Sequence, residues 1–561
     1  MTFYPLATEP FVRSIGPPVL PSAFIDLVNE AQSLAQFLVE IKAYKGGEAR
    51  SGGLSTVSEI PVASHPLDAG VDIGQVNLSY ADKHWTGSPT DADKPNEFYE
   101  GRVNVPLALE RFMPLLPEES RRVQRQFGDI QIANGDGSLD PIVQAYAVDG
   151  RQVRVLLGPT GGAYAEFGVV ADVVATGWFG DSLSVRIGLR DRTFTLDKPF
   201  QTTIYGGTGG ADGTAEIEGK PKPLVFGRVR NIAPLLVDPS NLIFQVHDGV
   251  VSDIDAVWDQ GAAITDSATD VSGYAALVAE SVSSGFYATA NDVGLFKLGA
   301  LPNGLVTCDV LGDATPTYTD TLDGITIRIL RDRHGLEQKF INIGTFIGAA
   351  SLAGAMGIYI GWFEQPTTSQ VLSNLLGSVA GWWGAARDGR IRAGRLVDPA
   401  RRSVGHFLTE FDIISLVPEI APIPRWRARV SYQRNWTPQR GEDLAASVTA
   451  ARRQFLTQSS LSVATTDATI QARHLNATDP PPLQSFFDTS TPAQALSDYI
   501  GGLHSPDRQV FTIVVSRVGF LMDFGTILNV KWPRYGLTSG KNFSIIGLRE
   551  EPDQVTLRIW G

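Results

Sequence analysis

Short runs of alternating apolar and polar residues, each followed by turn residues, most strongly restrict what this chain can fold into. Asp129–Ala133 alternates in this way, and Asn134–Gly137 after it has the composition of a tight turn. Further runs follow at hairpin-like spacing, at Gln152–Leu157, Val169–Val174 and Leu183–Leu189. The 57 Gly and 34 Pro residues are spread along the sequence and supply many more turns. The pattern predicts a mainly β protein built from short strands.

The chain is too long for one hydrophobic core, because such cores stop growing near ~250–300 residues. The Gly-rich stretch 205–213 and the Pro-rich linker Pro418–Pro424 are candidate boundaries within its 561 residues. We therefore expect a multidomain fold that is mainly β with an α+β insert. The predicted parts are an N-terminal β-rich domain (1–210), a middle β domain (211–320), an α+β domain (321–410) and a C-terminal β domain (411–561).

The α+β character begins near residue 321. Gln365-Pro366-Thr367 is typical of a helix start, and the residues after it form one apolar helical face. That face consists of Val371, Leu372, Leu375, Leu376 and Val379. Arg387-Asp388-Gly389 then predicts a turn that leads into a strand at Arg390–Gly394. In the C-terminal domain, strands are expected at Arg427–Tyr432, Thr526–Lys531, Phe543–Leu548 and Gln554–Trp560.

The first 126 residues give a less regular pattern. Phe24–Tyr44 has the spacing of an amphipathic helix, although its end, Phe37–Tyr44, alternates like a strand. Lys45–Asp93 is rich in Gly, Ser, Thr and Asp, which favours loops between short strands. Pro117–Gln126 is interpreted as a short polar helix with its arginines in solvent.

An uncharged segment, Ile341–Phe363, is long enough to span a bilayer and has two GxxxG spacings. Polar residues at Asn342, Thr345 and Ser351 interrupt it, and Gly354–Gly357 is typical of a break between two elements. We therefore expect a buried helix followed by a strand, and no stable membrane insertion.

Charge and cysteine content exclude several classes of protein. The net charge is −13 and no basic stripe is present, whereas proteins that grip a nucleic-acid backbone need one. We therefore expect no sequence-specific nucleic-acid partner. The single Cys308 excludes an intrachain disulfide framework and a Cys-rich metal site. The N-terminus lacks the basic and apolar regions of a signal peptide, which predicts synthesis in a cytoplasm.

Catalytic motifs are missing from the sequence. The seven His residues are isolated from one another, and there is no Gly-x-Ser-x-Gly elbow. The Gly-rich stretch 206–213 has neither P-loop nor GxGxxG spacing, so a linker is the better interpretation. Carboxylates are plentiful, which leaves a glycosidase pair open, but a dispersed surplus of Asp and Glu on solvated faces is the preferred explanation. The sequence predicts a protein that is not an enzyme and carries no cofactor.

One segment resembles half of a calcium-binding loop. Asn134, Asp136 and Asp140 place oxygen atoms at alternating positions, as in the first half of an EF-hand. Ala145 stands where the closing Glu would be, and no helix is expected before the loop. We interpret the segment as a turn, in which Gly135 or Gly137 takes a positive φ, and keep the calcium site as the alternative.

Several segments resemble tail proteins of siphophages and of gene-transfer-agent-like particles. The first is Phe127–Asp140, followed by Val148–Val153; in that family a strand, an Asn-x-Asp-Gly turn and a Leu-Asp pair precede a Gly-Arg-x-Val strand. The resemblance continues, in consistent order over about two thirds of the chain, through Ile329–Gly335, the strand Gly357–Ile360, the helix before Arg387–Gly389, Val430–Trp436 and Trp532–Leu537. Residues 1–100 add little to it.

The resemblance implies a baseplate or tail-tip hub, located in the virion after synthesis in the host cytoplasm. Such hubs are homotrimers in which each chain contributes two related, tube-type β domains to a ring. By similarity, one tube-type domain would include residues 411–561 and the other would lie in the N-terminal half. The ring joins the hexameric tail tube to distal parts and contributes to the conduit for DNA. Implied partners are further copies of the chain, a distal tail or tube protein, a central fibre and a tape measure protein. The family's iron–sulfur variants require several Cys residues, so this sequence departs from them.

Two other functions remain open. A receptor- or sugar-binding tail adhesin would use the aromatic clusters Trp382-Trp383 and Arg425-Trp426 as platforms, although rings of this kind more often pack in cores or subunit interfaces. A cell-wall hydrolase carried in the tail is the enzymatic alternative.

Overall fold

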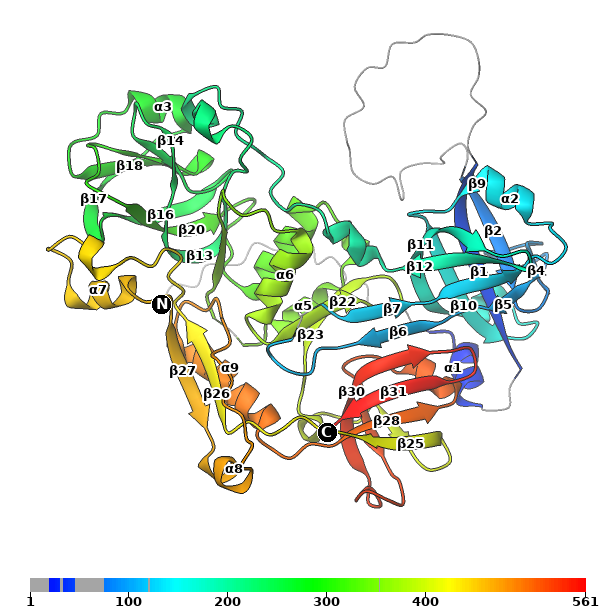
Figure 1. The fold of residues 1–561 in the computed structure, drawn as a ribbon. Coiled ribbons are helices and arrows are strands. Elements are labelled where there is room, and N and C mark those ends of the chain that lie inside the picture. The colour runs from blue at the N-terminus through cyan, green and yellow to red at the C-terminus, as the bar shows by residue number, and fades with distance from the viewer. Residues whose placement is uncertain (1–19, 31–33, 46–74, 120–121, 353) are drawn as a thin grey trace, which may run out of the picture.

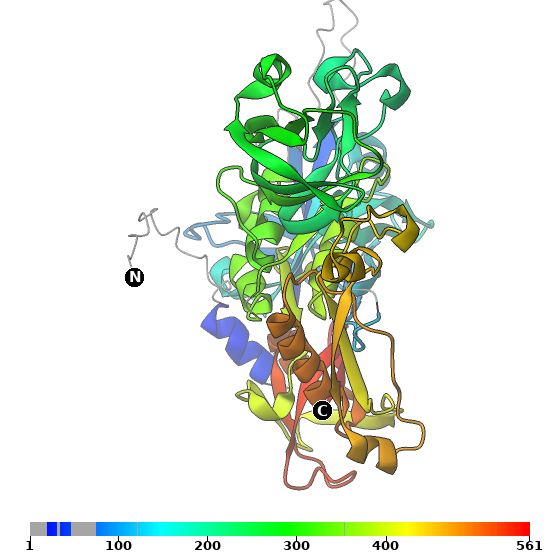
Figure 2. The same ribbon diagram turned by 90° about the vertical axis from the view of Figure 1, so that its left-hand side faces the viewer.

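The fold is mainly β and multidomain, with several curled sheets around a smaller helical centre (Figure 1). The computed structural model describes residues 20–30, 34–45, 75–119, 122–352 and 354–561. Most of the loop region expected within Lys45–Asp93 therefore lies outside the described residues. Figure 2 shows the lobe formed by residues 224–313 at the opposite end of the molecule from the C-terminal sheet.

The N-terminal sheet contains ten strands in the order β3-β4-β2-β1-β10-β11-β12-β8-β5, with β9 paired to β1. The predicted strands at 129–133, 152–157, 169–174 and 183–189 are confirmed as β8, β10, β11 and β12. The bounds are β1 (Ala35–Lys45), β2 (Gln75–Ala81), β3 (Trp85–Thr86), β4 (Phe98–Gly101), β5 (Val103–Val105), β8 (Asp129–Ala133), β9 (Tyr146–Ala147), β10 (Gln152–Pro159), β11 (Gly168–Gly180) and β12 (Ser184–Arg190). A short helix, α2 (Asp140–Ala145), precedes β9.

The C-terminal sheet has the order β24-β29-β30-β31-β28-β25. Its strands are β24 (His406–Leu408), β25 (Ile413–Glu419), β28 (Val510–Val515), β29 (Ile527–Val530), β30 (Lys541–Glu550) and β31 (Val555–Trp560). The last three expected strands are thus confirmed. Trp560, one residue from the end, is 1% exposed. β31 lies inside the sheet because it pairs with β28 on one side and β30 on the other.

A hairpin from the N-terminal half completes the C-terminal sheet. β6 (Leu109–Phe112) pairs with β7 (Gln124–Phe127) and also with the second half of β30. The hairpin lies between the two large sheets in Figure 1. The prediction of a helix at Pro117–Gln126 is therefore wrong. Its last three residues, Gln124–Gln126, belong to β7, because a strand partner in β6 is available fewer than twenty residues away.

The two large sheets share one hydrophobic core. The core includes Val39 and Ile187 from the N-terminal sheet and Leu557 from the C-terminal sheet, all buried. Helix α1 (Ser22–Asn29) adds Phe24, which is 1% exposed. The segment Phe24–Tyr44 thus contains both of the elements considered for it, a helix followed by strand β1. Because the core is continuous, the sheets behave as one structural unit.

A second lobe is formed by residues 224–313 and one later strand. Its order is β14-β15-β19-β18-β17-β16-β20-β13-β21, and α3 (Gly273–Ala279) covers it. The bounds are β13 (Leu224–Ile232), β14 (Leu235–Asp238), β15 (Ile243–Gln245), β16 (Val251–Asp259), β17 (Ala262–Asp270), β18 (Phe286–Ala290), β19 (Leu295–Leu298), β20 (Val306–Asp313) and β21 (Gly357–Ile360).

The helical centre connects the lobe to the large sheets. It contains α4 (Leu322–Arg328), α5 (Ile343–Ala349), α6 (Thr368–Gly377), β22 (Gly381–Ala385) and β23 (Ile391–Arg395). The predicted helix start is confirmed, because the Thr367 side chain accepts a hydrogen bond from the Gln370 N–H and forms a capping box with Gln370. Ile341–Phe363 is a helix followed by a strand, α5 and β21, as expected. The helix is buried on one side only, because Phe346 and Ala349 are buried whereas Ile347 is 55% exposed. No helix within the described residues is long and apolar enough to span a bilayer.

Residues 425–505 are inserted between two neighbouring strands of the C-terminal sheet, β25 and β28. The insertion contains β26 (Arg427–Tyr432), α7 (Ala450–Leu456), β27 (Leu461–Thr466), α8 (Ala468–Arg473) and α9 (Ser490–His504). Its apolar residues join the core of the helical centre. The predicted four-part division stays a prediction, but the hydrogen-bonded sheets group the residues differently from it. β21 and β24, for example, pair across the proposed boundaries at 320 and 410.

Candidate assembly surface

A buried group of charges holds the donated hairpin in place. Arg111 of β6 is 1% exposed and donates to Glu550 of β30, which is 0% exposed, over 3.2 Å. Arg387, in the turn between β22 and β23, donates to the same carboxylate. Asp523 lies 3.1 Å from Arg111 and 2.6 Å from Arg392 of β23. These five residues, here called the seam cluster, connect the hairpin, the C-terminal sheet and the helical centre.

The charges of the seam cluster depend on one another. Burial by itself raises the pKa of Asp523, but Arg111, Arg392 and Arg387 together hold that pKa well below its ordinary value. Burial lowers the pKa of Arg392, and Asp523 opposes this shift. Three cations therefore face two carboxylates in a region with little water, where removal of either carboxylate would leave cations uncompensated.

The C-terminal sheet also carries a run of exposed apolar side chains, here called the apolar strip. Its members and their exposures are Phe411 (91%), Ile414 (62%), Val417 (54%), Ile420 (96%) and Ile423 (52%). All lie on or next to β25, whose outer edge has no strand partner among the described residues. Five large apolar side chains exposed within one short segment make it a candidate contact surface, because single exposed apolar residues are ordinary but grouped ones are uncommon on monomers.

The local structure of β25 favours contact through side chains over the addition of another strand. The register between β25 and β28 shifts at Ile414, so a bulge turns this side chain outward. Pro418 lacks an N–H group and is typical of edge strands that do not accept a further partner. Sequence reasoning missed the apolar strip because it treated Pro418–Pro424 as a linker. The feature of the sequence that could have revealed the strip is the recurrence of a large apolar residue at every third position, from Phe411 before the linker to Ile423 within it.

The structure forms the predicted turn at Asn134–Asp140. Gly137 has a φ of 69°, so the prediction of a positive φ at Gly135 or Gly137 is confirmed. The Asn134 amide donates to Asp140 over 2.8 Å, and the Asn134 oxygen accepts from the Leu139 N–H. Asp136 is held by Arg102 through two hydrogen bonds of 2.9 and 2.8 Å. Neighbouring protein groups therefore form hydrogen bonds with oxygen atoms of all three proposed calcium ligands, and the calcium site stays a prediction.

We expect Gly137→Val to lower the free energy of unfolding by about 1–2 kcal/mol. A Cβ at this position would meet only the Asp140 carboxylate at 3.5 Å, so the expected cost comes from the backbone conformation and not from a clash. Thermal denaturation of the variant measures this effect. Wild-type protein treated with EDTA is the companion sample and should melt unchanged. A large fall in melting temperature that Ca²⁺ restores would support the calcium site instead.

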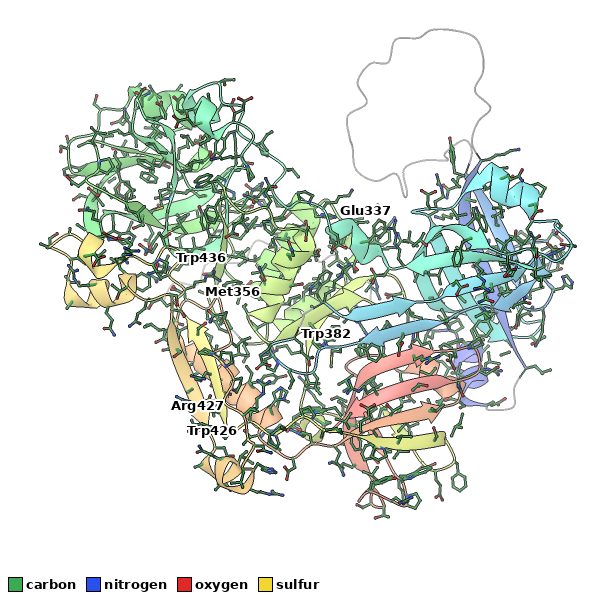
Figure 3. The ribbon with its side chains drawn as sticks, viewed as in Figure 1. Glu337, Met356, Trp382, Trp426, Arg427 and Trp436 are labelled. Carbon is green, nitrogen blue, oxygen red and sulfur yellow. The ribbon has the colours of Figure 1, made fainter. Side chains whose placement is uncertain are left out.

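The two aromatic clusters lie in different surroundings, as the separate positions of Trp382 and Trp426 in Figure 3 show. Trp382 and Trp383 are 5% and 0% exposed, and the Trp383 indole donates to Ser373 over 2.9 Å. The expected packing role is therefore confirmed for this pair, which offers no ring face to a sugar. Trp426 is half-buried, and the guanidinium of Arg427 lies 5.8 Å from its ring centre.

Titratable groups do not gather into a metal site in the part of the chain that the structure describes. No three His, Cys, Asp or Glu residues there are placed to share an ion. His247 is fully buried; it accepts a hydrogen bond from the Val225 N–H, and burial together with Arg333 keeps its pKa well below the ordinary value. This side chain is a neutral core residue. Cys308 is also buried, which raises the pKa of its thiol.

Neither a protein-family model nor a curated protein matches the chain. Solved structures do resemble it. They are proteins of phage tails, of a gene transfer agent and of a type VI secretion system.

Three of these structures illustrate the similarity. The 43 kDa tail protein of prophage MuSo2 from Shewanella oneidensis is 10% identical, with 83% of this chain and 95% of that one covered and a TM-score of 0.35. A chain in the virion of a native gene transfer agent is 12% identical, with 61% and 84% covered and a TM-score of 0.39. The E. coli c3393 protein, a type VI secretion component, is 11% identical, with 82% and 73% covered and a TM-score of 0.31.

Proposed function

We propose that this chain is a structural virion protein, a baseplate or tail-tip hub that joins the tail tube to distal tail parts. The observation that carries the proposal is the joining of two large curled sheets in one chain through a shared core and a donated hairpin. A rigid pair of sheets suits a ring-forming adaptor. Three chains with two sheets each supply six sheets, which matches a hexameric tail tube. The tail-protein resemblance of the sequence segments between residues 127 and 537 supports the same function.

In this proposal the chain forms a homotrimer, and the apolar strip packs against the neighbouring copy. A closed ring would cover the exposed side chains around β25, which are unfavourable in water. The negative net charge of −13 is compatible with a conduit through which DNA slides without binding. The proposed role is architectural, so the adhesin and hydrolase alternatives predict activities that a hub lacks. Binding on a glycan array or clearing in a peptidoglycan zymogram would favour them.

We expect the double variant Val417→Lys/Ile420→Lys to dissociate the trimer. Burying an unpaired charge in an apolar contact costs about 3–5 kcal/mol, so the dissociation constant should rise at least ~100-fold. Light scattering on purified protein measures the change, and circular dichroism should show an unaltered fold. Leu301→Lys is the matched control, because Leu301 is 79% exposed but lies on the distant lobe. A trimer that persists in the double variant would place the subunit contact elsewhere. A wild-type chain that is monomeric at every concentration would oppose the trimer itself.

Localisation tests the hub proposal directly. Gold-labelled antibody against the chain should mark the tail tip in negatively stained particles, with three-fold density at that position. Label distributed along the tail tube or on the capsid would contradict the assignment.

A further inference from the structure

A cleft of about 380 Å³ lies where the inserted residues 425–505 meet the helical centre. One wall is α6, another is the segment 117–119, and the third is β26 with the three consecutive prolines Pro480–Pro482. The volume falls in the range of small-ligand pockets, which begins at about 300 Å³. Figure 3 shows Trp436 and Trp426 at opposite ends of β26, so the strand spans this side of the molecule between them.

Three guanidinium groups line the cleft, and two of them have partners. Arg425 is 6% exposed and donates two hydrogen bonds, of 2.7 and 2.6 Å, to Glu118. Arg429 donates to the Pro480 carbonyl over 2.8 Å and lies 3.1 Å from Asp479. These contacts hold the walls of the cleft in place, and the positive charges of Arg425 and Arg429 are compensated by Glu118 and Asp479.

The third guanidinium, that of Arg434, is positioned without an anionic partner. Its centre lies 4.0 Å from the ring centre of Trp436 and 5.6 Å from that of Phe486, which also lines the cleft. Within the described part of the chain it forms no hydrogen bond or ion pair. Burial lowers its pKa, with Glu364 as a weaker opposing influence. A guanidinium stacked on aromatic rings keeps its plane fixed while its N–H groups remain available for a planar anion.

The rest of the lining indicates which kind of anion fits. Leu483, Ala428 and Ile500 contribute apolar surface beside the prolines, and Ser373 and Asn374 contribute polar groups from α6. A lone inorganic ion would leave most of this space and all of its apolar surface unfilled. A peptide would cover that surface while an acidic side chain or terminal carboxylate reached Arg434. We propose that this cleft binds an acidic peptide segment of a partner protein, with its carboxylate held by the Arg434 guanidinium.

The inference depends on the cleft and not on the hub proposal, so it can fail or succeed independently of tail assembly. The probe is a pool of fluorescein-labelled tetrapeptides that end in Asp or Glu with a free carboxylate. A matched pool ends in Asn or Gln amides, and inorganic phosphate is the small-anion competitor. Fluorescence polarisation with the full chain reports binding.

We expect the acidic pool to bind and the amide pool to bind at least about tenfold more weakly, since hydrogen bonds to charged groups are strong. Arg434→Gln should weaken acidic-pool binding by roughly 10- to 100-fold. Arg434→Lys, which keeps the charge but loses the forked donor geometry, should fall between wild type and Arg434→Gln. Arg440→Gln is the matched control, because the side chain of Arg440 is 82% exposed and does not line the cleft. Thermal melts of each variant establish that it is folded.

Several outcomes would overturn the proposal. These are equal binding of the two pools, equal effects of Arg434→Gln and Arg440→Gln, and no binding of either pool by the folded chain. Phosphate that binds with the same dependence on Arg434 while peptides do not would identify a site for free anions and would likewise exclude a peptide partner.

Discussion

Glu550→Gln is expected to lower the free energy of unfolding by about 3–5 kcal/mol, because it leaves buried cations without their counter-charge. Glu550 is 0% exposed and is the partner of both Arg111 and Arg387. In the variant, Asp523 alone would face three guanidinium groups. The amide keeps the size of the side chain, so the loss measures charge and hydrogen bonding and not a cavity. Urea denaturation followed by tryptophan fluorescence is the measurement.

The control for this variant is Glu442→Gln, at a side chain that is 76% exposed and pairs loosely with Arg440 at 3.8 Å. Exposed pairs contribute about 0–1 kcal/mol, so the denaturation midpoint should hardly move. If the two variants shift the midpoint equally, the seam cluster does not hold the sheets together.

The dependence of the free energy of unfolding on pH provides a second test of the seam cluster. The pKa of Asp523 is lower in the folded chain than its ordinary value, so the ionised carboxylate stabilises the fold. This contribution is complete above the unfolded pKa of about 3.9 and is lost as the pH falls toward the folded value.

Removing Gln554–Gly561 is expected to give insoluble protein and particles without tails. The deletion takes away β31, which lies between β28 and β30 and pairs with both. Two central strands would then expose their edges, which promotes aggregation. The core would also lose Trp560, whose ring lies 4.6 Å from the guanidinium of Arg508. The effect should be more severe than loss of an edge strand, because the sheet is divided into two parts.

The measurement is complementation of a deletion strain with the truncated gene, followed by imaging of the particles and assay of the soluble protein. Trp560→Phe is the control, since it keeps the strand and an aromatic side chain in the core and should restore tails. Infectious particles of normal appearance that contain the truncated chain would show that the C-terminal sheet is dispensable. The hub proposal would then be withdrawn.

Strand and helix identities could be predicted where the pattern is local. β8 and β10 follow from alternation, because successive side chains of a strand point to opposite faces. α6 follows from its capping residues and from apolar residues on one helical face. The helix-then-strand structure of Ile341–Phe363 follows from polar interruptions and a Gly-rich break. In each case the information lies within the segment itself.

Predictions failed or stayed incomplete where the structure of a segment depends on a partner outside that segment. The segment Pro117–Gln126 has a composition that suits a polar helix, yet part of it forms β7 against β6. The apolar strip and the cleft around Arg434 could not be predicted from the sequence either. Two members of the apolar strip, Ile420 and Ile423, fall in the segment that was interpreted as a linker, and the other three precede it. Arg434 is one of many arginines in the sequence, and only the fold places it beside Phe486 in a cleft that α6 also lines.

The sequence by itself therefore determined the mainly β composition, the positions of several strands, the capped helix and the resemblance to tail proteins. Only the tertiary structure decided that β6 completes a sheet formed by the end of the chain, placing Arg111 beside Glu550 across 439 positions. It also decided that residues 425–505 are an insertion and that β31 is a central strand. The physical reason is that the spacing of apolar residues indicates which face of a helix or strand is buried. Strand pairing and charge compensation depend instead on which helices and strands contact one another in the fold. A short stretch of sequence does not specify these contacts between distant elements.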